Sequence, residues 1–106
     1  MQDKMQALQL VEQQIQHLAS QRQTLQLQIS EIDSALEELK VKEEAYKMVA
    51  GIMIKYKSVD LNKSLTQQIK VFKLRIDKLE TQEEKLGGKA QKLQKELLKE
   101  MGGKNE

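Results

Sequence analysis

The feature that most constrains the fold of this chain is a heptad repeat near its start. Apolar residues recur there at alternating steps of three and four, with a single charged interruption at Arg22. This first seam consists of Leu8, Val11, Ile15, Leu18, Arg22, Leu25, Ile29, Ile32, Leu36 and Leu39. Such spacing keeps a narrow apolar stripe on one side of a helix, and a partner helix must cover that stripe. We therefore predict a long helix over residues 1–43.

A second seam with the same spacing occupies the C-terminal half. It consists of Leu65, Ile69, Phe72, Ile76, Leu79, Glu83, Leu86, Ala90, Leu93 and Leu97. Asp60 precedes it and is a candidate N-cap, so we predict a helix over residues 60–101 and a frayed tail over 102–106. Gly87 and Gly88 leave the seam in phase, so the pair is either a hinge or simply tolerated. Since neither helix is stable without a packed face, we expect the two to form an antiparallel coiled coil.

Between the seams the apolar period changes to two. Residues 45–58 are rich in β-branched and aromatic side chains and predict a β-hairpin that turns at Ala50 and Gly51. Counting the alternation along the segment places Tyr46, Met48, Ile52, Ile54 and Tyr56 on one face and Val49 and Met53 on the other. One helix pair cannot cover both faces, so hairpins from several chains are expected to pair edge to edge. The predicted fold is mostly α: a single domain of two long helices joined by a single β-hairpin.

The charges favour pairing of the two helices. Residues 1–45 carry four Lys or Arg and eight Asp or Glu, a net −4, whereas residues 46–106 carry fourteen and eight, a net +6. If Leu39 lies near Leu65, the two charged interruptions, Arg22 and Glu83, fall at nearly the same height. We predict that they meet across the seam and fix its register. The alternative is that each side chain reaches solvent separately.

Assembly at the hairpin would leave the far ends of both helices projecting from the assembly. The apolar residues at these ends, called the tip residues, are Met1, Met5, Leu8, Leu10, Val11, Leu93, Leu97, Leu98 and Met101. Leu10 and Leu98 lie off the seams and are expected to be exposed. Exposed surface that contains methionine suits binding of varied partners. The alternative is that these are ordinary apolar residues on frayed helix ends.

The composition excludes several classes of site. The chain has no Cys and a single His, His17, so disulfides, thiolate zinc sites and a Ser-His-Asp triad are excluded or improbable. Three aromatic residues and a net charge of +2 argue against nucleic-acid binding. No apolar run is long enough to span a membrane, and Met1-Gln2-Asp3-Lys4 opens no signal peptide. We expect a cytoplasmic protein that is not an enzyme and needs no cofactor or metal.

Four short motifs suggest a family. In order along the chain they are Ala35-Leu36-Glu37-Glu38-Leu39, Tyr46-Lys47, Gly51-Ile52-Met53-Ile54-Lys55 and Gln82-Glu83-Glu84. In this order and spacing the chain resembles the beta-type subunit of prefoldin, a chaperone of archaea and eukaryotes. The single hairpin marks the beta type, because alpha-type subunits have a second hairpin. The family usually places its turn glycine where Ala50 stands, so the glycine here is displaced by one residue.

The resemblance implies a hetero-hexamer of alpha-type and further beta-type subunits, whose hairpins form a double β-barrel hub with coiled-coil tentacles. Such assemblies hold unfolded client proteins at the tentacle tips without ATP and deliver them to a group II chaperonin. The basic run Lys85, Lys89, Lys92, Lys95 and Lys99 is then either a solvated face or a contact for an acidic chaperonin surface. A second interpretation is a coiled-coil scaffold or adaptor that oligomerises through its hairpin and has no chaperone activity.

Overall fold

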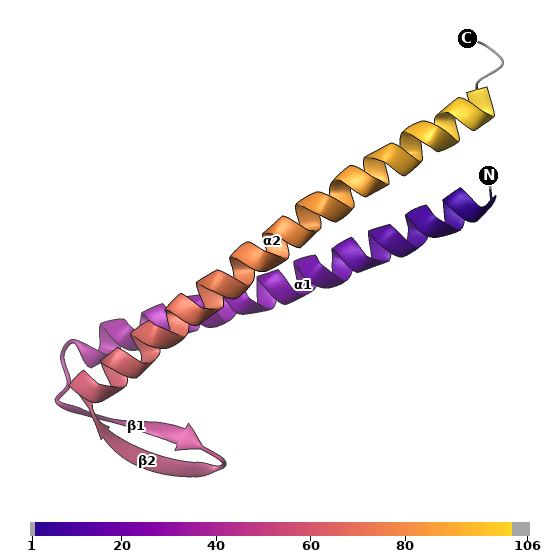
Figure 1. Cartoon of the computed structure of the whole chain (residues 1–106). Helices are drawn as coiled ribbons and strands as arrows, with labels where there is room; N and C mark the ends of the chain where they lie inside the picture. Colours follow the sequence, from indigo (N-terminus) through magenta and orange to yellow (C-terminus); the bar gives the residue numbers. More distant parts are fainter. Residues whose placement is uncertain (1, 103–106) are drawn as a thin grey trace. The chain divides into compact units, whose positions relative to one another are not determined.

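The computed structural model describes residues 2–102, which form a helix, a two-stranded hairpin and a second helix (Figure 1). Helix α1 spans Gln2–Leu39, strand β1 Glu44–Val49, strand β2 Ile52–Lys57 and helix α2 Ser58–Gly102. This order confirms the predicted fold class of two long helices joined by one antiparallel hairpin.

The described residues divide into two compact units. The terminal unit combines residues 2–23 of α1 with residues 77–102 of α2, and the hairpin unit comprises residues 24–76. In each unit a segment of α1 is paired with a segment of α2, and the hairpin unit also contains β1 and β2. Met1 and most of the predicted frayed tail, residues 103–106, lie outside the described residues.

Burial within each unit follows the heptad spacing. All positions of both seams are buried or half-buried, including Arg22 and Glu83. The most deeply buried apolar side chains are Val11 and Leu97 in the terminal unit, and Leu39, Leu61, Ile69 and Ile76 in the hairpin unit. Leu61 is absent from the predicted seam, because its step of four to Leu65 is followed by a second step of four and so breaks the alternation of three and four. Because two helices shield only one stripe of each other, rows of Leu and Ile suffice for this core.

The helix ends differ from the prediction. Helix α1 ends at Leu39, earlier than predicted, and the next three N–H groups donate to carbonyls three residues back at 3.3–3.5 Å. That pattern is the tight turn with which many helices terminate. Helix α2 begins at Ser58, whose N–H donates to the Glu43 carbonyl at 2.8 Å. The prediction that Asp60 caps α2 is therefore wrong: Asp60 lies in the first turn, where its carboxylate still interacts favourably with the helix dipole.

The hairpin closes with a two-residue turn. Val49 pairs with Ile52, and the intervening Ala50 and Gly51 have φ angles of 50° and 79°. Positive φ at both central residues is the mark of the type I′ turn, whose twist matches that of the flanking strands. Glycine adopts this conformation readily, whereas for alanine it costs about 1–2 kcal/mol. Ala50 is thus the strained position of the turn.

The predicted division of the hairpin side chains between two faces is wrong. The register pairs Tyr46 with Lys55 and Met48 with Met53, and directly opposed residues of an antiparallel pair share a face. One face, the methionine face, carries Tyr46, Met48 and Met53 with Glu44, Lys55 and Lys57. The other, the isoleucine face, carries Val49, Ile52, Ile54 and Tyr56 with Ala45 and Lys47. A two-residue turn pairs odd with even positions, so an alternation counted straight through the turn assigns one strand to the wrong face.

Candidate functional site

The two charged interruptions of the seams meet in the terminal unit, as predicted. Arg22 Nε donates to Glu83 Oε1 at 2.9 Å, and the two side chains are only 25% and 18% exposed. This hydrogen bond raises the pKa of the Arg22 guanidinium above its ordinary value. A contact between charged groups inside an otherwise apolar seam can be satisfied in few registers. Its role in fixing the register remains a prediction.

A second contact of the same kind joins the ends of the helices. The Lys4 ammonium contacts the Glu100 carboxylate and lies 3.7 Å from Glu96 Oε2. The hydrogen bond from Lys4 holds the pKa of Glu100 below its ordinary value. Here, as in the Arg22–Glu83 pair, the cation comes from α1 and the anion from α2, although the net charges of the two halves have the opposite sense. Position in the helix pair, rather than net charge, therefore decides these contacts.

The tip residues fall into three classes by exposure. Met5, Leu10, Leu98 and Met101 are exposed, with Leu10 at 57% and Leu98 at 69%. Leu8 and Leu93 are half-buried, whereas Val11 and Leu97 are buried in the seam, and Met1 lies outside the described residues. The four exposed side chains can contact a partner directly. Val11 and Leu97 instead hold the two helices together and could contact a partner only if the helices separated.

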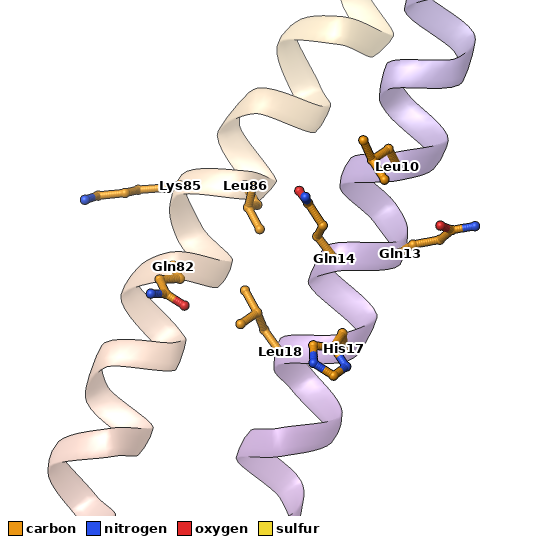
Figure 2. Close-up of a pocket in the computed structure, with 8 residues that line it drawn as sticks. All are labelled: Leu10, Gln13, Gln14, His17, Leu18, Gln82, Lys85 and Leu86. Atoms are coloured by element: carbon orange, nitrogen blue, oxygen red, sulfur yellow. The ribbon is translucent and has the colours of Figure 1, made fainter.

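Beside the seam, the terminal unit has an open groove of about 600 Å³ between its two helical segments (Figure 2). It is lined by Leu10, Gln13, Gln14, His17, Leu18, Gln82, Lys85 and Leu86. The side chains of Leu18 and Leu86 point into the gap from opposite helices, whereas Lys85 extends outward from α2. Sequence reasoning missed this groove, because it assigned Leu18 and Leu86 wholly to helix pairing. The exposed Leu10, off the seam but on the same helix, was the one available signal.

The hairpin exposes apolar side chains on both of its faces. Tyr46, Met48 and Met53 are exposed on the methionine face, where Lys55 Nζ also lies 2.6 Å from Glu44 Oε2. On the isoleucine face Val49, Ile52 and Ile54 are exposed and Tyr56 is half-buried. A monomeric protein rarely leaves so much contiguous apolar surface in contact with water. All seven residues predicted for subunit assembly are thus at least partly accessible to another chain.

A metal-ligand cluster and a membrane-spanning helix are both absent from residues 2–102. Over residues 2–102 no cluster of three or more His, Asp or Glu side chains could hold a metal ion. Neither α1 nor α2, over their described lengths, contains an apolar stretch that could cross a bilayer. His17 lies with its Nε2 atom 3.3 Å from Gln21 Nε2 on the same helix.

Comparison with known proteins places these features in a family. The family model described as "Prefoldin subunit" matches residues 2–104. A prefoldin subunit beta of Archaeoglobus fulgidus is 38% identical over 93 residues, which cover 85% of this chain and 80% of the relative. Another, from Methanococcoides burtonii, is 32% identical over 104 residues, covering 95% and 89%. The crystal structure of the prefoldin beta subunit from Thermococcus strain KS-1 matches with a TM-score of 0.82 at 28% identity, over 92% of this chain and 88% of that one. The resemblance to the beta type is confirmed, and the chain belongs to the prefoldin family of chaperone subunits.

Proposed function

We propose that this chain is a subunit of an ATP-independent holdase that captures non-native polypeptides with its tip residues. The observation that carries the proposal is the exposure of Met5, Leu10, Leu98 and Met101 within one unit. Non-native chains expose apolar side chains, and flexible methionine and leucine side chains can adapt to many of them. Capture of this kind is a binding step driven by apolar contact, so the proposed activity requires neither nucleotide nor cofactor and involves no enzymatic step.

The hairpin is the proposed assembly element. An isolated two-stranded hairpin is marginally stable, and its outer edges can pair with further strands. Pairing with the hairpins of other subunits would cover both the methionine face and the isoleucine face. Since the relatives are named beta subunits, we propose a cytoplasmic hetero-hexamer with alpha-type subunits and further beta-type copies. Delivery of the captured client to a group II chaperonin completes the proposed role.

The test is suppression of aggregation of a chemically denatured client enzyme by the assembled complex. In one variant the four exposed tip residues are replaced by serine. In the matched control two leucines that are equally exposed but outside the terminal unit, Leu27 and Leu74, are replaced in the same way. We expect suppression to be lost in the tip variant and retained in the control, with both complexes of wild-type size in sedimentation.

Two outcomes would contradict the proposal. If the tip variant still suppresses aggregation, capture does not occur at these residues. If the wild-type complex assembles but has no effect on aggregation, the chain is a scaffold or adaptor that uses its hairpin only to oligomerise.

A further inference from the structure

The groove of the terminal unit has a cationic rim on α2. Lys85 lines the groove, and Lys89, Lys92 and Lys99 follow it at helical spacing, all exposed. Lys85, Lys89 and Lys92 each precede a seam residue by one position, so they project on the same flank of the helix pair as the groove residue Gln82. Lys85 and Lys92 lie about 10 Å apart along the axis, given a rise of about 1.5 Å per residue.

The facing wall on α1 carries no carboxylate. Between Met5 and Gln21 the single charged residue at neutral pH is Glu12, which follows a seam residue instead of preceding one and so projects from the opposite flank. The groove wall on α1 consists of Leu10, Gln13, Gln14, His17 and Leu18. A ligand in the groove therefore meets leucine, glutamine and histidine side chains of α1 on one side and Gln82, Lys85 and Leu86 of α2 on the other.

Most carboxylates of α2 in the terminal unit lie away from this flank. Glu80 and Glu84 each follow a seam position by one residue and so project from the other flank. Glu96 is the exception: it lies within the lysine row, 3.7 Å from the Lys4 ammonium that also contacts Glu100. The flank with the groove is thus basic, although the described residues of the terminal unit hold as many acidic as basic side chains.

We propose that this groove binds acidic amphipathic segments of non-native polypeptides, and so gives the holdase a preference among its clients. Leucine-sized side chains of the segment pack between Leu18 and Leu86 and against Leu10, while its carboxylates pair with Lys85, Lys89 and the lysines that follow. Carboxylates two helical turns apart match the spacing of Lys85 and Lys92. A second copy of this chain is a poor occupant, because it would bring its own lysine row against this one. The inference rests on the proposed chaperone function and names the client chemistry.

The test measures peptide binding to the assembled complex by fluorescence anisotropy. The probe is a labelled helical peptide with leucines along one side and glutamates beside them, and its partner probe has lysine in place of each glutamate. We expect the acidic peptide to bind at least tenfold more tightly than the basic one, and added salt to reduce this difference because it screens exposed charges.

Two variants separate the apolar and charged parts of the groove. Leu10→Ser should weaken binding of both peptides, whereas Leu27→Ser, an exposed leucine elsewhere on α1, should change neither. Replacing Lys85, Lys89 and Lys92 by glutamine should weaken the acidic peptide alone and abolish the preference. The matched replacement of Lys63, Lys70 and Lys73, which are exposed on α2 outside the groove, should preserve it.

Equal affinity for the two peptides would overturn the proposal. So would a preference for the acidic peptide that survives replacement of Lys85, Lys89 and Lys92, and so would peptide binding that Leu10→Ser leaves unchanged. Sedimentation showing that Leu10→Ser disrupts self-association of the complex would assign the groove to a second copy instead. The aggregation assay separates failure of the proposed groove from failure of the proposed chaperone function. A complex that suppresses aggregation but shows no acidic preference refutes only the groove, whereas one that binds peptides without suppressing aggregation refutes the proposed function.

Discussion

Replacing Gly87 and Gly88 by alanine should stabilise the protein by about 2 kcal/mol. Helix α2 runs without a break from Ser58 to Gly102, so both glycines are in a helix interior. Apart from the adjoining residues and the nearby backbone of α2 itself, a Cβ atom added at either position meets nothing within 4 Å, so alanine introduces no clash. Glycine is about 0.8–1.0 kcal/mol less favourable than alanine at such a position, and the two substitutions should act almost additively.

Urea unfolding followed by far-UV circular dichroism measures this gain. With a slope of about 1–3 kcal/mol per molar urea, about 2 kcal/mol raises the midpoint by roughly 1 M. Several protein concentrations are needed, because assembly also contributes to apparent stability. A loss of stability or of helical signal would refute the reasoning, since it would mean that the glycines need a conformation that alanine cannot adopt.

The same variant tests whether the glycine pair is a hinge. If bending at Gly87 and Gly88 is needed to hold a client, the stiffer double-alanine complex should suppress aggregation less well than the wild type. Unchanged suppression would leave the pair as glycines that a long helix simply tolerates. The continuity of helix α2 through Gly87 and Gly88 favours this second interpretation.

Gly51→Ala is a control for which we expect the opposite effect, a loss of stability. It changes the same atoms, and a Cβ at Gly51 also meets nothing within 4 Å. Its φ angle of 79°, however, lies in the left-handed region, where alanine costs about 1–2 kcal/mol. Stabilisation in the helix and destabilisation in the turn would together isolate backbone conformation as the cause.

Three further predictions concern single side chains. Ala50→Gly should relieve the strained turn position and stabilise the hairpin by up to about 1 kcal/mol, seen as slower amide exchange in β1 and β2; unchanged exchange would contradict the strain. Leu97→Ala should cost about 2–4 kcal/mol in thermal unfolding, whereas Leu98→Ala, at the adjacent exposed position, should cost less than about 0.5 kcal/mol; equal losses would contradict the assigned burial. Lys4→Gln should raise the pKa of Glu100 toward its ordinary value in an NMR titration, because Lys4 lowers that pKa in the wild type. The stabilisation from this pair is present at neutral pH and is lost as the pH falls through the lowered pKa. An unmoved pKa would rule out the contact.

The helical part of the fold could be predicted because heptad spacing is a direct consequence of helix geometry. The alternation of three and four that selects Val11 or Ile69 also determines which side chains face the other helix. The Arg22–Glu83 contact followed from the same geometry once a register was assumed. Leu61 lies within the predicted helix but was missed, because its step of four to Leu65 does not continue the alternation of three and four.

The hairpin faces and the groove could not be predicted in the same way. The turn at Ala50 and Gly51 was predicted, but which strand positions share a face also depends on the register across it, and a two-residue turn pairs odd with even positions. The groove combines side chains from α1 and α2 that are more than sixty residues apart in the chain, such as Leu18 and Leu86. Whether such side chains fill the space between two helices depends on their rotamers and on the distance between the helices, neither of which a residue pattern specifies.

The opposite net charges of the two halves of the chain correctly led us to expect that the helices pair, but they do not explain which charged side chains meet. The interhelical contacts at Arg22 and Lys4 lie on the seam or continue its spacing, four residues before Leu8 in the case of Lys4, and both take their anion from α2. Charges on the seam spacing are brought together by the packing of the leucines around them, so their signs are matched locally whatever the net charge of each half. The positive excess of α2 lies instead on exposed positions such as Lys85 and Lys89, where solvent screens any attraction to α1. An excess that contributes so little to helix pairing is better placed to select a partner, as the proposed binding of acidic segments requires.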